Sequence, residues 1–117
     1  MIKNYGRRKL SVTSSHRRSL LRNLAQSLFQ HEKITTTLSK AKEVAGFSER
    51  LITMARPKDL NARRALLREI NNREVLKKLI DVLVPRYQDR KGGYTAIMRL
   101  GRRVGDRAEM AIVKLIS

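Results

Sequence analysis

The first 31 residues contain seven Lys or Arg residues and two His residues but no Asp or Glu. An even distribution of the ten acidic residues over the 117 positions would place two or three of them in this segment. Repulsion between like charges opposes a compact fold unless counter-charge is supplied. A nucleic-acid backbone supplies that charge densely and releases condensed counterions when it is bound, so this segment is typical of a protein that contacts a polyanion.

The excess of positive charge extends over the whole chain and also favours a polyanionic partner. It has 27 Lys or Arg residues against ten Asp or Glu residues, a formal net charge of +17, whereas a free small domain usually carries about 2 to 8. Seventeen of the cations are Arg, whose planar guanidinium binds phosphate through two parallel hydrogen bonds. Two Phe, three Tyr and no Trp leave few rings for base stacking, so recognition is expected to depend on charge and shape.

Other classes of function are disfavoured. The absence of Cys excludes disulfides, thiolate metal sites and thiol nucleophiles, and it fits a reducing compartment. No apolar run approaches the length of a membrane span, and no apolar segment follows the basic start, so we expect a cytoplasmic protein without a membrane partner. His16 and His31 are too few to build a metal site, and the pair His31-Glu32 has no pocket residues to make it catalytic. We therefore predict no enzyme activity, cofactor, metal or small-molecule substrate.

The N-terminal part of the chain is expected to combine a tail with a helix. Residues 1–12 lack a helical period and mix glycine with cations, which predicts a basic, disordered tail that becomes ordered on its partner. From the N-capping residues 13–15, apolar residues at helical spacing predict a helix to about Gln30. The positions of Arg18 and Arg22 opposite the apolar stripe give this helix a basic outer face.

The middle of the chain predicts one strand and three helices. β-branched residues alternate over Glu32–Leu38, which is typical of a short strand. A second helix is expected from Ser39 as its cap to Arg56-Pro57, because the residue before proline avoids the helical region. A third helix is expected to begin at Asp59.

A fourth helix is predicted from Asn72 to Pro85, where the proline is expected to end it. Alternation over Tyr94–Arg102 and Glu109–Ile116 then predicts a closing β-hairpin. The predicted fold is of the α/β (α+β) class, with a small mixed sheet packed against helices in the order α-β-α-α-α-β-β. Residues 13–117 would form one globular domain.

Short motifs stand at characteristic positions along most of the chain. They include Ser14-Ser15-His16-Arg17, Leu21-Arg22-Asn23-Leu24, Lys40-Ala41-Lys42-Glu43, Asn61-Ala62-Arg63-Arg64, Gly92-Gly93-Tyr94-Thr95, Gly105-Asp106 and Met110-Ala111. In this order and spacing they resemble the family of bacterial large-ribosomal-subunit protein seventeen, from about Arg7 to Ile116. Members of that family usually have a more basic start than Met1-Ile2-Lys3 and a cation at the position of Val12, so neither position inherits an RNA contact from the resemblance.

The resemblance implies a structural protein of the large ribosomal subunit. It implies binding to large-subunit ribosomal RNA near the exit side of the peptide tunnel, with neighbouring ribosomal proteins as further contacts. Whether the ribosome is that of a bacterial cytoplasm or of an organelle is left open, as are the RNA helices and protein neighbours involved, the order of assembly and any role outside the ribosome.

We expect the RNA contacts to come from cations, hydroxyl groups and glycines in the tail, the first helix and the later loops. The candidate residues are Lys3, Arg7, Arg8, Lys9, Ser15, His16, Arg17, Arg18, Arg22, Lys40, Arg63, Arg64, Arg90, Lys91, Gly92, Gly93, Arg102 and Arg103. For the tail, the alternatives are a solvated run of charge or an organelle-targeting segment. Ser15 could instead be a helix cap, and residues 90–93 could be a flexible entry to the hairpin.

Two other functions compete with the ribosomal one. The helices from Asp59 and from Asn72 could mimic a helix-turn-helix, which would suit an architectural DNA-binding protein of the nucleoid. The first amphipathic helix could instead lie on a membrane surface. Neither alternative accounts for a resemblance along the whole chain.

Overall fold

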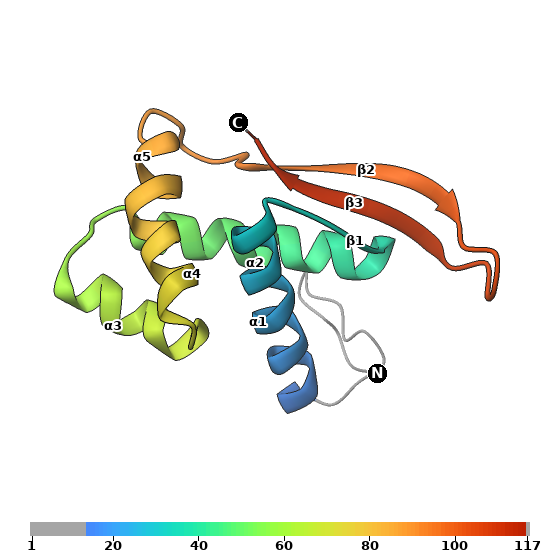
Figure 1. Ribbon diagram of the computed structural model, residues 1–117, viewed down its shortest axis with the longest axis horizontal. Coiled ribbons are helices and arrows are strands. Elements are labelled where there is room, and N and C mark those ends of the chain that lie inside the picture. The colour runs from blue at the N-terminus through green and yellow to red at the C-terminus, as the bar shows by residue number, and fades with distance from the viewer. Residues whose placement is uncertain (1–13, 117) are drawn as a thin grey trace, which may run out of the picture.

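The computed structural model describes residues 14–116. In chain order the elements are α1 (Ser14–His31), β1 (Lys33–Thr37), α2 (Leu38–Ala55), α3 (Leu60–Glu69), α4 (Arg73–Lys78), the π-helical turn η1 (Leu79–Leu83), α5 (Val84–Arg86), β2 (Thr95–Arg102) and β3 (Glu109–Leu115). Figure 1 shows the strands running alongside α2, with α1 crossing that helix. Because α4, η1 and α5 form one continuous helical segment, the predicted order of elements and the α+β class are confirmed.

The sheet has three strands in the order β1-β3-β2, and both neighbouring pairs are antiparallel. The expectation of a mixed sheet is therefore wrong with respect to strand direction. β1 and β2 run in the same direction, so a parallel pair would arise only if these two strands were adjacent in the sheet. The hairpin places β3 against β1 instead, so that no parallel pair arises among the described strands.

The core lies between α2 and the elements packed around it. Val44 and Ile52 of α2 are fully buried, as are Ala111 and Val113 on the face of β3 that meets the helices. Burial of one Val, Leu or Ile side chain contributes roughly 1.5 to 3 kcal/mol to stability. One continuous apolar cluster joins these residues to α1 and to the α4 segment, so the surface elements described below are held on a rigid base.

The helix caps predicted at Asp59 and Asn72 are confirmed. The carboxylate of Asp59 accepts a hydrogen bond from the amide of Ala62 at 2.7 Å, and the side-chain oxygen of Asn72 accepts one from the amide of Glu74 at 2.9 Å. The prediction of Ser39 as the cap of α2 is wrong, because the helix begins at Leu38 and the preceding residue makes no side-chain capping bond. Leu38 is buried, so packing rather than capping fixes this start.

Pro85 lies within the last turn of the fourth helix, in α5, so the prediction that it ends the helix is wrong. A proline ring clashes with the carbonyl four residues earlier in a regular α-helix. Here the preceding turn widens to η1, in which the amide of Val84 bonds to the carbonyl of Leu79 five residues back. The wider turn accommodates the ring, and the chain leaves the helical segment only after Arg86.

The β2–β3 hairpin projects past the helices at the right of Figure 1. Only the first part of β2 is partly covered, and the residues from Ile97 to Arg102 are exposed. Pairing shifts between Arg99 and Gly101, so that Leu100 is the extra residue of a β-bulge. Gly101 adopts a φ of 106°, which L side chains rarely adopt. The bulge and this glycine fix the path of the projecting arm.

Candidate nucleic-acid interface

The projecting hairpin carries four exposed arginines, Arg99, Arg102, Arg103 and Arg107. Arg99 lies opposite Ala111 in the ladder, whereas Arg102 lies opposite Glu109. Because the arm stands away from the helices (Figure 1), these side chains are accessible from more than one direction. Arg99 lies where the sheet still has three strands, because Ala111 also pairs with Thr36 of β1, and only the end of the hairpin beyond Met110 is two-stranded. Exposed cations along such a projecting arm suit contact with RNA phosphates.

One of the four arginines is held by an acid of the same turn. Arg103 donates two hydrogen bonds to the carboxylate of Asp106, from Nε at 3.0 Å and from Nη2 at 2.6 Å. These bonds, together with one from the amide of Ala108, hold the pKa of Asp106 far below its usual range. Asp106 therefore stays ionised at neutral pH and shapes the turn. The predicted contact of Arg103 with RNA would have to compete with this pair.

Arg22 bonds to α3, whereas the helical spacing predicts that it points outward from α1. Its Nε lies 3.0 Å from Oε2 of Glu69, and its Nη2 lies 3.3 Å from Oε1. The hydrogen bond to Glu69 raises the pKa of Arg22, and the same bond lowers the pKa of Glu69. About a third or less of either side chain is exposed. Arg22 is thus part of the contact between two helices.

Arg17 likewise turns inward, while its neighbours stay at the surface. Its Nη2 lies 3.5 Å from the carboxylate of Glu43 on α2, a side chain that is 6% exposed. Ser15, His16 and Arg18 are exposed in the first turns of α1. The structure therefore divides the predicted basic face of α1 into a paired part and an accessible part.

The remaining candidates lie on three further elements. Arg63 and Arg64 are exposed on α3, and Lys40 is partly buried on α2. In the loop before β2, Lys91 and Gly92 are exposed. Lys3, Arg7, Arg8 and Lys9 lie outside the described residues.

The loop from Arg90 to Gly93 is ordered by its own hydrogen bonds. Arg90 donates from Nη1 to the carbonyl of Gly93 at 3.2 Å, and its own carbonyl accepts from the hydroxyl of Tyr94 at 3.2 Å. Gly93 has a φ of 65°, a conformation that favours glycine. Arg56 donates to the hydroxyl of Tyr94 and to the carbonyl of Gln88. This loop presents Lys91 on a fixed turn.

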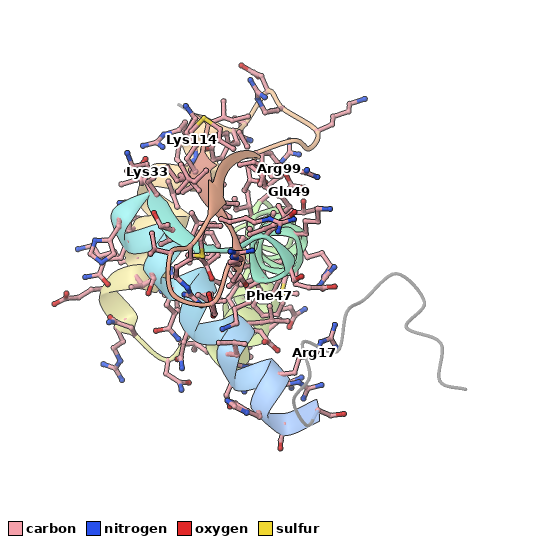
Figure 2. All side chains as sticks on the ribbon, turned by 90° about the vertical axis from the view of Figure 1, so that its right-hand side faces the viewer. Arg17, Lys33, Phe47, Glu49, Arg99 and Lys114 are labelled. Carbon is pink, nitrogen blue, oxygen red and sulfur yellow. The ribbon has the colours of Figure 1, made fainter. Side chains whose placement is uncertain are left out.

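Two contacts of the structure are absent from the predictions made on the sequence. Lys33 and Lys114 form a directly opposed cross-strand pair at the exposed side of the sheet, visible together in Figure 2. Arg50 lies over the ring of Phe47, with 5.9 Å between the guanidinium carbon and the ring centroid. The spacing of three residues on one helix is a signal for the Arg50–Phe47 contact. The sequence around either residue does not predict that Lys33 lies opposite Lys114, because the two strands are far apart in the chain.

Residues 14–116 contain no group of three His, Asp or Glu side chains that could hold a metal ion. In the same range, no helix has both the length and the apolar character needed to cross a membrane. The exposed cations of the described residues are dispersed over the surface, and some of them form ion pairs. The β2–β3 hairpin is the part of the described structure that projects from the rest (Figure 1).

Comparison with known proteins identifies the family. Residues 20–116 match the family described as Ribosomal protein L17. The chain belongs to the ribosomal protein L17 family. A relative from Endomicrobium trichonymphae, named Large ribosomal subunit protein bL17, is 57% identical over 117 residues, with 100% of both chains covered. Relatives of the same name from Thermus thermophilus and Halothermothrix orenii are 50% and 46% identical, over 93% of this chain in both cases and over 93% and 96% of theirs.

Membership of the L17 family confirms the resemblance found in the sequence motifs. This is a family of ribosomal proteins, not of enzymes. The exposed cations therefore belong to a protein whose family works within a ribonucleoprotein particle.

Proposed function

We propose that this protein is a structural constituent of the large ribosomal subunit and binds its RNA. The observation that carries the proposal is similarity over the full length of a relative named Large ribosomal subunit protein bL17. Ribosomal RNA supplies the counter-charge that a chain of net charge +17 requires. The protein would act by neutralising phosphates so that RNA segments can pack closely.

The hairpin is the main RNA-binding element of this proposal. Arg99, Arg102 and Arg107 are exposed on an arm whose path is fixed by the bulge at Leu100. A rigid arm loses little conformational freedom on binding, and this favours affinity. The shape and register of the phosphate contacts would give specificity, because the described residues offer few exposed rings for reading bases.

Secondary contacts come from the accessible part of α1, with Ser15, His16 and Arg18, and from Arg63 and Arg64 of α3. The tail, with Lys3, Arg7, Arg8 and Lys9, is proposed to become ordered on RNA between neighbouring segments, and residues 13–117 to form the single globular domain. A location near the exit side of the peptide tunnel, neighbouring ribosomal proteins as partners and a cytoplasmic ribosome belong to the same proposal.

A nucleoid protein using α3 and α4 as a helix-turn-helix is less well supported. The exposed residues of the would-be recognition helix are Arg73, Glu74 and Lys77, with Asp81 following in η1. Two acids thus accompany two cations on the surface that would enter the major groove. Such a surface would place carboxylates near phosphates, and the two further cations of this helical segment, Lys78 and Arg86, are paired with Glu32.

The test is assembly combined with chemical footprinting. The full-length tagged protein is expected to comigrate with large-subunit particles in a sucrose gradient and to protect large-subunit RNA from chemical modification. Absence from these particles, or comigration with DNA, would overturn the proposal.

A matched pair of triple variants tests the role of the hairpin. Replacement of Arg99, Arg102 and Arg107 by Gln should flatten the dependence of log K on log salt by about 2 to 3, since each phosphate contact that is removed reduces the slope by about 0.7 to 0.9. Replacement of Lys58, Arg73 and Lys77 by Gln removes the same charge elsewhere and should change the slope less. A hairpin variant with the salt slope of the wild type would remove the hairpin from the RNA-binding surface.

A further inference from the structure

A hollow of about 410 Å³ opens among α1, α2 and α3. Its walls include Arg17, Arg18, Phe47, Arg50 and Met54. Phe47 and Arg17, both labelled in Figure 2, come from α2 and α1 and line the same hollow. The volume falls in the range of roughly 300 to 1,000 Å³ that is usual for sites of small ligands.

Phe47 distinguishes this hollow from the rest of the described surface. Among residues 14–116 the other Phe and Tyr rings, those of Phe29, Tyr87 and Tyr94, are at most 2% exposed. Phe47 is only partly buried and packs its inner side against the core. Its ring, with the guanidinium of Arg50 at 5.9 Å, is the one Phe or Tyr ring within this range that is partly exposed, and the other exposed rings of the range are the imidazoles of His16 and His31.

The charge of the hollow favours an anionic occupant. Arg17, Arg18 and Arg50 line it. Arg17 lies 3.5 Å from Glu43, whereas Arg18 and Arg50 are exposed. The one acid in the wall, Glu69, already accepts two hydrogen bonds from Arg22. The first turn of α1 also contributes Ser14, and the start of a helix has a positive potential. An occupant with both a flat apolar part and a negative group would complement these walls.

We infer that this hollow binds one unpaired nucleotide of RNA. The base would stack against Phe47 and contact Met54, and Arg18 and Arg50 would face the phosphate. Single-stranded RNA is commonly recognised in this way, by bases splayed onto aromatic rings or Arg guanidinium planes. The inference rests on the proposed function, and it adds a site for an unstacked base to a surface that otherwise offers phosphate contacts.

The absence of Trp from the chain provides a direct test. The Phe47→Trp variant places the sole tryptophan of the protein in the hollow, and the matched Val82→Trp variant places it on η1 at a residue that is 46% exposed. Single-stranded oligoadenylate is expected to quench the fluorescence of the Phe47→Trp variant, because a stacked base quenches indole. Duplex RNA of equal length should quench it much less, and neither should quench the Val82→Trp variant.

Binding affinity gives a second, independent measurement. Loss of one base stacked on a ring corresponds to about a 5- to 150-fold weaker binding. Phe47→Ala and Phe47→Leu should both show this loss for oligoadenylate, and Phe47→Tyr should retain the wild-type affinity. Arg18→Gln, a change at an exposed residue, should lower the salt slope for oligoadenylate by about 0.7. Thermal unfolding of each variant checks that it is folded.

Several results would overturn the inference while leaving the proposed function intact. One is unchanged oligoadenylate binding by folded Phe47→Ala while the protein still enters large-subunit particles. Another is a Phe47→Trp variant already shielded from iodide and unaffected by RNA, which would indicate that part of the chain fills the hollow. Quenching by an acidic peptide but not by oligoadenylate would indicate a protein partner. Absence of the wild-type protein from the particles would instead defeat the proposed function.

Discussion

Substitution by Gln should lower the stability of the fold at Arg22 and reduce the phosphate contacts with RNA at Arg64. Arg22 joins α1 to α3 through two hydrogen bonds to Glu69, and the partners lie 47 positions apart in the sequence. Arg64 is exposed on α3, and the residues one turn away from it, Leu60 and Arg68, are not acidic. Replacement of either by Gln removes one positive charge and hardly changes helix propensity. The two variants therefore separate a contact within the fold from a contact with RNA.

The magnitude for Arg22→Gln follows from the burial of the pair. Exposed ion pairs contribute up to about 1 kcal/mol, and breaking a fully buried pair costs about 3 to 5 kcal/mol. The side chains of Arg22 and Glu69 are 30% and 24% exposed, so we expect a loss of about 1 kcal/mol in the free energy of unfolding. For a chain of this length that corresponds to a decrease in Tm of roughly 4 °C. Arg64→Gln should change the unfolding free energy by less than about 0.5 kcal/mol.

The salt dependence of RNA binding should change more in Arg64→Gln than in Arg22→Gln, the reverse of the order expected for stability. Arg64→Gln is expected to reduce the slope of log K against log salt by about 0.7 to 0.9, and Arg22→Gln by less than half of that. The assays are urea denaturation of the full chain at pH 7 and filter binding to large-subunit RNA over a range of salt concentrations. A double-mutant cycle with Glu69→Gln should give a coupling energy of about 0.5 to 1 kcal/mol.

The behaviour of Arg22→Gln can refute the assignment of Arg22 to a contact within the fold. If Arg22→Gln left the unfolding free energy unchanged and lowered the salt slope as much as Arg64→Gln, Arg22 would bind phosphate in solution. The division of the basic face of α1 into a paired part and an accessible part would then be wrong.

Three further predictions concern the fold. Asp59→Ala should lower the free energy of unfolding by about 1 kcal/mol through loss of the cap on Ala62, while Asp59→Asn, which keeps an acceptor, should lower it less in thermal unfolding. Leu66→Ala, at a fully buried residue, should cost about 2 to 5 kcal/mol in urea denaturation, against less than about 0.5 kcal/mol for Leu67→Ala, at a residue 43% exposed. Glu32 has its pKa lowered by hydrogen bonds from Arg86 and Lys78, so its stabilising effect is present above the unfolded pKa of about 4.3 and is lost as the pH falls through the lower folded value. The difference in unfolding free energy between wild type and Glu32→Gln should therefore be largest near pH 7 and disappear in strong acid, and a difference that persists there would contradict this assignment.

Local chemistry allows much of the fold to be predicted from the sequence. Asp59 and Asn72 cap helices because their side chains reach amides two or three residues ahead, a geometry contained in the neighbouring sequence. The alternation over β3 likewise depends only on the burial of every second residue, Ala111, Val113 and Leu115. The π turn before Pro85 is not predictable in this way, because the burial of Leu83 and Val84 keeps the chain helical past a residue that usually ends a helix.

The candidate site is predicted less completely, because its geometry depends on contacts between distant elements. Helical spacing places Arg22 opposite the apolar stripe, and such a position usually faces solvent. Packing of α3 against the same side of the molecule brings Glu69 within hydrogen-bond distance. The hollow around Phe47 needs three helices to form its walls, so a sequence pattern along one helix could indicate the Arg50 contact but not the cavity.

The placement of the acids explains how so basic a chain can fold. All ten acids lie within the described residues, and at least six of them bond inside the protein: Glu32, Glu43, Glu49, Asp59, Glu69 and Asp106. Four of these six neutralise cations whose mutual repulsion would otherwise oppose packing, including Arg17 and Arg22 of the acid-free segment. The acid-free start therefore obtains part of its counter-charge from α2 and α3. The cations outside these pairs, such as Arg18, Arg64 and Arg99, are the ones whose charge is left for an external polyanion.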